Sequence, residues 1–238
     1  MAVQALIFDV FGTLVDWRGS IARQLAPVFT AKGIGTDPAA FADAWRARYD
    51  PAMDPVREGL EAYRPLDDLH LENLRHTLLQ FGLSDRFETA ELDEMNRVWE
   101  RLDPWEDVVP ALTRLKRDYL IAPCSNGSIA MMARLATHGA LPWDCVLGAD
   151  IARSYKPDPE VYRAAVNALR LDAGEVVMVA SHNGDLAAAA ACGLKTAFVP
   201  RPGEHGPGQT SDLRAEGAWT WVAEDLVQLC DLLDGPAL

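Results

Sequence analysis

The residues best suited to chemistry in this 238-residue chain lie just after short apolar runs. Asp9 ends the first run, Ser125 and Asn126 follow the second, Lys156 follows the third, and SHNGD at 181–185 follows the fourth. A carboxylate can act as a nucleophile, and a nearby ammonium group keeps it ionised. One aspartate after a strand is more often a turn former, but four polar clusters in this order predict an active site.

The apolar runs are bounded by turns or helical patterns and are rich in β-branched residues, which predicts buried parallel strands. Helical patterns lie between most of them, so we expect an α/β fold with a Rossmann-like, doubly wound parallel sheet. In such a sheet the carboxyl ends of the strands meet at one edge. The expected strands are 3–8, 119–124, 145–149, 176–180 and 196–200, followed by a Pro/Gly-rich surface loop at 200–212 and a last strand and helix within 217–233.

Residues 18–100 interrupt this alternation, because they carry helix patterns and no convincing strand. Asp37 is a plausible N-cap with Pro38 at the first helical position. The sequence predicts a helical cap at 18–100, inserted into an α/β core formed by 1–17 and 101–238. The expected cap helices lie within 36–50, 66–83 and 89–102.

Composition and charge limit the kinds of function that the protein can have. Hydrophobic residues make up 49% of the chain and charged residues 24%, an ordinary balance for a globular protein. The formal net charge of −13 opposes binding to nucleic acid or to an anionic membrane face. We find no basic leader and no apolar stretch near the length of a membrane span, so we expect a cytoplasmic protein. The four scattered cysteines are interpreted as reduced thiols, mostly in the core.

Four segments in order, FDVFGTL, SNGS, YKPDPEVY and HNGD, resemble the motifs of the haloacid dehalogenase superfamily. The resemblance covers nearly the whole chain, including the position of the inserted cap, and implies that Asp9 is a nucleophile. Phosphatases of the superfamily carry a second aspartate two residues later, where this chain has Phe11, which can neither protonate nor deprotonate a substrate. Asp185 is followed by alanines, so the site looks poor in ligands for Mg²⁺, and no metal is expected.

The chain most resembles the L-2-haloacid dehalogenases, which hydrolyse 2-haloalkanoic acids to 2-hydroxy acids without a metal. The resemblance implies that Asp9 displaces halide from C2 with inversion, and that water then hydrolyses the aspartyl ester. It implies a small halogenated carboxylate as substrate and no cofactor, and it is compatible with a homodimer. The implied catalytic residues are Asp9, Thr13, Ser125, Lys156 and Asp185.

The implied substrate and halide contacts are Phe11, Arg46, Asn126, Tyr162, Ser181, His182 and Asn183. Arg46 would face the leaving halide, unless it is a solvated surface residue and Arg48 takes its place. Tyr162 could equally be a packing residue of its helix. His182 stands where the best-matched dehalogenases usually have asparagine, so it could line the pocket, contact the leaving group, help to activate water or only bond locally.

Lys156 would keep Asp9 ionised, and Thr13 and Ser125 could hold the nucleophile or the substrate carboxylate. Two roles for Asp185 compete, since it could activate water or pair with Lys156. The sequence does not separate them.

The same residues also allow other functions to be considered. The substrate could be another 2-substituted carboxylate, such as fluoroacetate or a small-ring amino acid. An Mg²⁺-dependent phosphatase lacks its acid at Phe11. A Ser125–His182–Asp185 esterase is disfavoured, because CSNGS is not a nucleophile elbow. A non-enzymatic binding module would leave the nucleophile, lysine and final aspartate without a role.

Overall fold

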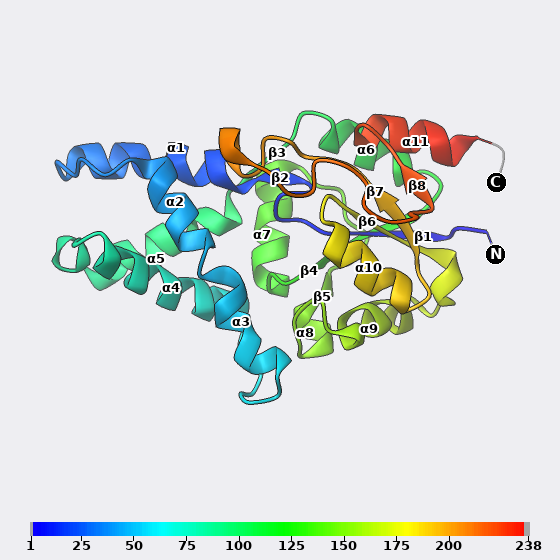
Figure 1. The fold of residues 1–238 in the computed structure, drawn as a ribbon, viewed down its shortest axis with the longest axis horizontal. Coiled ribbons are helices and arrows are strands. Elements are labelled where there is room, and N and C mark those ends of the chain that lie inside the picture. The colour runs from blue at the N-terminus through cyan, green and yellow to red at the C-terminus, as the bar shows by residue number, and fades with distance from the viewer. Residues whose placement is uncertain (1, 236–238) are drawn as a thin grey trace.

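The computed structural model describes residues 2–235 as a β-sheet with helices on both faces and a helical segment beside it (Figure 1). Six parallel strands run in the order β5-β4-β1-β6-β7-β8. The chain builds outward from β1 first in one direction and then in the other, which confirms the predicted doubly wound fold. The strands are β1 (Ala5–Phe8), β4 (Leu120–Ser125), β5 (Leu147–Gly148), β6 (Val176–Ala180), β7 (Lys195–Phe198) and β8 (Trp221–Val222).

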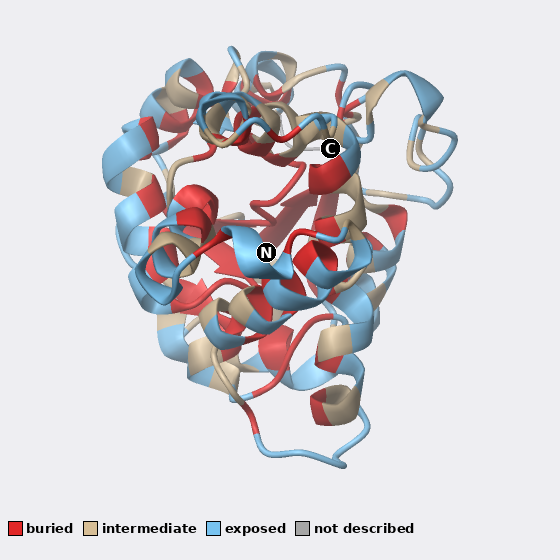
Figure 2. Ribbon diagram, turned by 90° about the vertical axis from the view of Figure 1, so that its left-hand side faces the viewer, coloured by how far each residue is buried: buried red, intermediate tan, exposed pale blue. Residues whose placement is uncertain are grey.

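Alternate residues of the central strand β1 face two different cores. Ala5 and Ile7 share a buried cluster with residues of α9 (Pro159–Leu169) and α10 (Asn183–Ala191). Leu6 and Phe8 share the other cluster with α6 (Val108–Leu115), α7 (Ile129–Gly139) and α11 (Leu226–Asp234). Figure 2 shows the central strands buried. Burial on both faces requires unbroken apolar runs, which is why these strands were predictable.

The chain leaves the sheet through β2 (Val15–Asp16) and returns through β3 (Asp103–Pro104), and these two strands pair antiparallel. Two residues each are too few for a sequence pattern, so this pair was not predicted. The segment between them lies to the left of the sheet in Figure 1, as the predicted insertion requires. It contains α1 (Trp17–Ala31), α2 (Pro38–Arg46), α3 (Tyr49–Arg57), α4 (Leu66–Gln80) and α5 (Thr89–Asn96), with 3₁₀-helices at Ser84–Arg86 and Arg97–Glu100.

The single helix predicted over 36–50 is wrong, because α2 ends at Arg46 and α3 begins at Tyr49. Pro51 accounts for the break. Its ring would clash with the carbonyl of Ala47 in a continuous helix, and it has no N–H to donate. In the first turn of α3 that N–H needs no helical partner, so the proline is tolerated there.

The strand predicted over 145–149 is shorter than expected. Gly148 has a φ of +122°, and a Cβ atom there would lie 2.1 Å from the backbone oxygen of Ser125. The backbone of β5 therefore approaches β4 at a point where only glycine fits. The chain then turns into a short helix, α8 (Ala149–Ala152).

The segment 200–212 is not wholly the surface loop that was predicted, because Arg201 and Glu204 are buried. Arg201 donates two hydrogen bonds of 2.9 Å to the carboxylate of Asp107 and one of 2.8 Å to the carbonyl of Thr13. Burial of a guanidinium group is tolerated when a carboxylate pairs with it in this bidentate way. The loop is thereby held against the turn that follows β1.

All four cysteines are free thiols, but only Cys124 and Cys230 are buried as predicted. Cys192 is half-buried and Cys145 is exposed. Within residues 2–235, no helix has the length and apolar character needed to cross a membrane.

The close approach at Gly148 predicts that Gly148→Ala lowers the free energy of unfolding by at least about 2 kcal/mol. The added methyl group would meet backbone, which cannot move aside as a flexible side chain can. Urea denaturation measures the change. Gly35→Ala is the matched control, because Gly35 is exposed and a Cβ atom added there would meet no atom within 4 Å. Equal stabilities of the two variants would contradict the assignment.

Candidate active site

Asp9 lies directly after β1, between β4 and β6, where the strand order reverses. This is the position at which doubly wound sheets bind ligands. Its Oδ1 accepts a hydrogen bond of 2.8 Å from Lys156 Nζ. Its Oδ2 accepts one of 2.6 Å from Thr13 Oγ1 and lies 3.1 Å from His182 Nδ1.

These contacts keep Asp9 ionised in a buried place. Burial by itself would raise the pKa of Asp9. The charge of Lys156 and the hydrogen bond and charge of His182 outweigh it, and they hold that pKa well below its ordinary value. An ionised carboxylate stripped of water is a competent nucleophile.

Lys156 links two of the predicted strand ends. Besides Asp9, its Nζ contacts Asp185 Oδ2 at 2.5 Å. The lysine side chain is 7% exposed, so the two carboxylates replace the water that its ammonium group has lost. Its backbone N–H donates to Asn126 Oδ1 at 2.8 Å, which ties it to the end of β4.

Both oxygens of Asp185 have a partner, since Tyr162 donates its phenol O–H to Oδ1 at 2.5 Å and Lys156 contacts Oδ2. Burial and the charge of Asp185 raise the pKa of Tyr162, which therefore stays a protonated donor. Of the two competing roles, the geometry favours pairing with Lys156 over activation of water. Tyr162 both packs in the core and bonds to Asp185, so neither of its two interpretations was complete.

A cavity of about 370 Å³ opens over these groups, between the sheet edge and the helical segment. Phe11 forms part of its wall, is 2% exposed and packs edge-on against Tyr49 and Trp99. The lining residues are Asp9, Phe11, Arg46, Tyr49, Asp50, Arg57, Asn126, Lys156, Pro157, Tyr162, His182, Gly184, Asp185 and Asp212.

Arg46, rather than Arg48, supplies a cation from the cap. Its guanidinium carbon lies 3.7 Å from the ring centroid of Tyr49 and 5.6 Å from that of Trp17. Its Nη1 is buried and has no hydrogen-bond partner among the described residues. Arg48 bonds instead to the exposed Gln80, at 3.4 Å. The cation at the cavity therefore has a donor left for an anion.

Besides Thr13, three predicted site residues do not line the cavity, and each holds a neighbouring loop instead. Ser125 is fully buried, and its Oγ accepts the N–H of Gly127 at 3.1 Å. Ser181 donates its backbone N–H to Thr13 Oγ1 at 2.9 Å, which orients the threonine toward Asp9. The Asn183 side chain donates to Asp212 Oδ1 at 2.8 Å.

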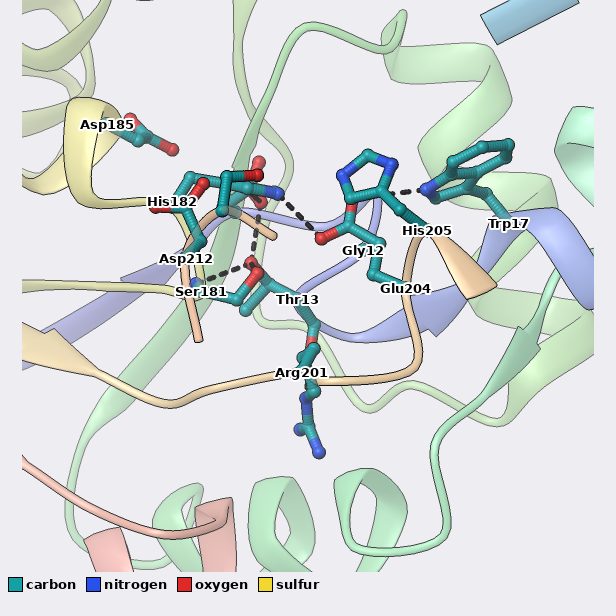
Figure 3. Close-up of polar contacts among 12 residues, drawn as sticks. Gly12, Thr13, Trp17, Ser181, His182, Asp185, Arg201, Glu204, His205 and Asp212 are labelled. Carbon is teal, nitrogen blue, oxygen red and sulfur yellow. Dashed lines mark hydrogen bonds and ion pairs between the residues drawn. The ribbon is translucent and has the colours of Figure 1, made fainter. Parts of the chain in front are cut away.

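His182 contacts the nucleophile Asp9 on one side. On its other side lies the buried carboxylate of Glu204 (Figure 3). Its Nε2 lies 2.9 Å from Glu204 Oε2, and Glu204 Oε1 accepts the indole N–H of Trp17 at 3.1 Å. Burial lowers the pKa of His182. The charge of Glu204 and the hydrogen bonds to Asp9 and Glu204 raise it well above its ordinary value. The side chain is therefore an imidazolium between two carboxylates.

Sequence reasoning missed Tyr49, Arg57, Glu204 and Asp212, which belong to no motif. The adjacent charged pair Glu204 and His205, within a Pro/Gly-rich loop, was the available hint. His182, Glu204 and His205 bring possible metal-ligand atoms within 4.8 Å of one another. Glu204 already contacts His182 at 2.9 Å and His205 at 3.5 Å, and we assign no metal to the group.

Comparisons with known proteins identify the family of the chain. Residues 3–193 match the haloacid dehalogenase-like hydrolase family, and the chain belongs to that family of hydrolases. It is 29% identical to (S)-2-haloacid dehalogenase 4A of Burkholderia cepacia over 205 residues, which cover 85% of each chain. The predicted superfamily is therefore confirmed.

Two solved structures narrow the relationship within the family. One is the crystal structure of a defluorinating L-2-haloacid dehalogenase, 46% identical, with a TM-score of 0.96 over 98% of this chain and 96% of that chain. The other is the crystal structure of an L-2-haloacid dehalogenase, 44% identical, with a TM-score of 0.93 over 98% of this chain and 100% of that chain. The predicted resemblance to the L-2-haloacid dehalogenases is confirmed.

The pairing of Lys156 with Asp9 predicts a change in pH dependence. In the native chain Asp9 stays ionised down to below about pH 4, because its pKa is depressed. In Lys156→Met the burial persists without the ammonium group. The pKa of Asp9 then rises, and kcat/KM falls as the pH decreases through a range above about 4, with a loss of at least about 10²-fold at neutral pH.

Lys116→Met is the control, because Lys116 is a more exposed lysine that also pairs with an aspartate, Asp144, at 2.7 Å. Its kcat/KM profile against pH should match that of the native protein. A native profile for Lys156→Met would contradict the role assigned to the ammonium group.

Proposed function

We propose that this chain is an (S)-2-haloacid dehalogenase that hydrolyses small 2-haloalkanoic acids to 2-hydroxy acids without a metal. The observation that carries the proposal is the setting of Asp9. It is ionised, accepts hydrogen bonds from Lys156 and Thr13, and faces a cavity with an apolar wall at Phe11. Asp9 attacks C2 from the side opposite the halide, so the configuration at C2 inverts. Water then attacks the aspartyl carbon of the ester and restores Asp9.

Arg46 and Asn126 supply the donors that recognise the substrate and the leaving group. Among the described residues the buried Nη1 of Arg46 has no hydrogen-bond partner, and Asn126 lines the same cavity from the sheet edge. A halide leaving C2 gains negative charge as its bond breaks, and donors placed there stabilise it. Phe11 keeps water from that side, as a dry displacement at carbon requires.

The helical segment 18–100 acts as a cap over a core formed by 1–17 and 101–238. Arg46, Tyr49 and Arg57 reach the cavity from this segment, whereas Asp9 and Lys156 reach it from the sheet edge. Arg57 also donates to the backbone carbonyl of Lys156, which joins the two sides. A site divided in this way excludes water when the cap closes.

A phosphatase is disfavoured by the chain's own side chains. Phe11 occupies the place of the general acid, and Asp9 and Asp185 both pair with the ammonium group of Lys156. Mg²⁺ needs several free oxygen ligands, and these two carboxylates already have partners.

Fluoroacetate is a second candidate substrate, because a protein that is 46% identical to this chain is named as a defluorinating dehalogenase. Fluoride is small and needs a close-fitting set of donors. A panel of chloro-, fluoro- and small-ring 2-substituted carboxylates, assayed under identical conditions, ranks the candidates by kcat/KM.

A cytoplasmic location and a homodimer complete the proposal. The four free thiols support a reducing compartment. Light scattering on the purified protein measures its mass against the 26.1 kDa of one chain.

We expect chloride release from L-2-chloropropionate in the presence of EDTA, and none from the D enantiomer. Asp9→Asn should abolish release, because an amide is not a nucleophile at carbon. Ion chromatography measures chloride, and circular dichroism checks the fold of the variant. Activity that vanishes with EDTA, or p-nitrophenyl phosphate hydrolysis that appears with Mg²⁺, would instead support the phosphatase.

A single turnover in ¹⁸O-water with excess enzyme tests the ester. The label should enter the Asp9 carboxylate and not the product, because water attacks the aspartyl carbon. Mass spectrometry of the peptide that contains Asp9 and of the hydroxy acid locates it. Label found directly in the product would exclude the ester route.

A further inference from the structure

The two oxygens of the Asp9 carboxylate lie in unequal surroundings. Oδ2 has two partners, Thr13 Oγ1 at 2.6 Å and His182 Nδ1 at 3.1 Å, whereas Oδ1 has only Lys156 Nζ at 2.8 Å among the described residues. A carboxylate oxygen offers two in-plane lone pairs for hydrogen bonds. Both are occupied on Oδ2 and one is left on Oδ1, so Oδ1 is the oxygen available to attack carbon.

If Oδ1 forms the ester, Oδ2 becomes its carbonyl oxygen and keeps both donors. We propose that His182, paired with Glu204, forms with Thr13 the oxyanion-stabilising site for hydrolysis of the ester on Asp9. His182 is then a catalytic residue of the second half-reaction, and Glu204 is the residue that positions and charges it. This inference rests on the proposed function.

The steps balance in atoms and electrons. The electron pair of Oδ1 forms the bond to C2, and the halide leaves with the electrons of its own bond. Water then attacks Cγ of Asp9, and the carbonyl electron pair moves onto Oδ2, where Thr13 and His182 donate to the new negative charge. Cγ releases Oδ1 with the product. One proton of the water ends on the product hydroxyl and the other goes to solvent.

The carboxylate of Glu204 is buried and is held in place by several contacts. It is 1% exposed, and it lies so close to Gly12 that a Cβ there would be 2.1 Å from Oε1. The indole of Trp17 holds that same oxygen at 3.1 Å. A buried carboxylate with these fixed contacts can hold the imidazole ring in one orientation, with Nδ1 toward Asp9.

His182 retains a carboxylate partner when Asp9 is esterified. Esterification neutralises Asp9, but the charge of Glu204, the largest influence that raises the pKa of His182, stays. The other titratable and charged groups near this pair are His205, whose Nε2 lies 3.5 Å from Glu204 Oε1, Lys156 on the far oxygen of Asp9, and Arg46 in the cap. An imidazolium donor is stronger than a neutral one.

Single-turnover kinetics of His182→Asn tests the role of the ring. Ester hydrolysis should slow by about 10²-fold, and by more than halide release slows, because Lys156 still activates Oδ1. Intact-mass spectrometry should then show the ester accumulating on Asp9. His76→Asn is the matched control, because His76 is exposed on α4. Ester hydrolysis at the native rate in His182→Asn would overturn the inference.

The Glu204→Gln variant tests whether the positive charge of His182 is needed or only the position of its ring. The amide keeps a hydrogen bond to the ring but removes the negative charge, so the pKa of His182 falls. Hydrolysis of the ester should then be lost at a pH about one unit or more below the pH at which the native protein loses it. Glu61→Gln, at an exposed position, should leave the profile unchanged. An unshifted profile in Glu204→Gln would contradict the role of its charge.

The native protein supplies a test that does not depend on the folding of a variant. Its ester hydrolysis, followed after one turnover across the pH range, should be flat and then fall as His182 loses its proton. A rate that rises with pH through the same range would mean that His182 acts as a base, and would overturn the inference. Failure of the proposed function looks different, because the native protein would then release no halide at all.

Discussion

The bridge from Lys156 to Asp9 and Asp185 is the interaction on which the rest of the site depends. A buried ammonium group loses its hydration and is stable only if carboxylates replace it, and here two strand ends supply them. The same bridge keeps Asp9 ionised and occupies Asp185. Two further residues support this bridge. Tyr162 donates a hydrogen bond to Asp185, and Asn126 accepts the backbone N–H of Lys156.

The charges around the nucleophile form a nearly balanced set. Asp9, Asp185 and Glu204 are anions, and Lys156 and the imidazolium of His182 are cations. The set carries one net negative charge before the Arg46 guanidinium is counted. Asp50 and Asp212 also line the cavity, and the cations of Arg46 and Arg57 match them in number, so the site is close to balanced although the whole chain has a net charge of −13. Local placement of a few cations, not overall charge, makes an anionic substrate acceptable.

The core and the insertion contribute different kinds of side chain to the cavity. The sheet edge holds the reacting groups, because the reversal of strand order at β1 leaves a crevice there. The insertion contributes aromatic rings and a cation, with Arg46 stacked over Tyr49 and Phe11 packed between Tyr49 and Trp99.

The sequence by itself determined the sheet, the helical insertion and the polar segments after the strands that contain Asp9, Lys156 and Asp185. Buried strands need unbroken apolar runs, which leave a pattern that can be recognised in the sequence. Only the tertiary structure decided that Asp185 pairs with Lys156, since the choice depends on distance. It also decided that Glu204 reaches His182, 22 residues away in the chain. That contact follows from the path of an irregular loop, set by buried ion pairs, and a loop path has no periodicity to read.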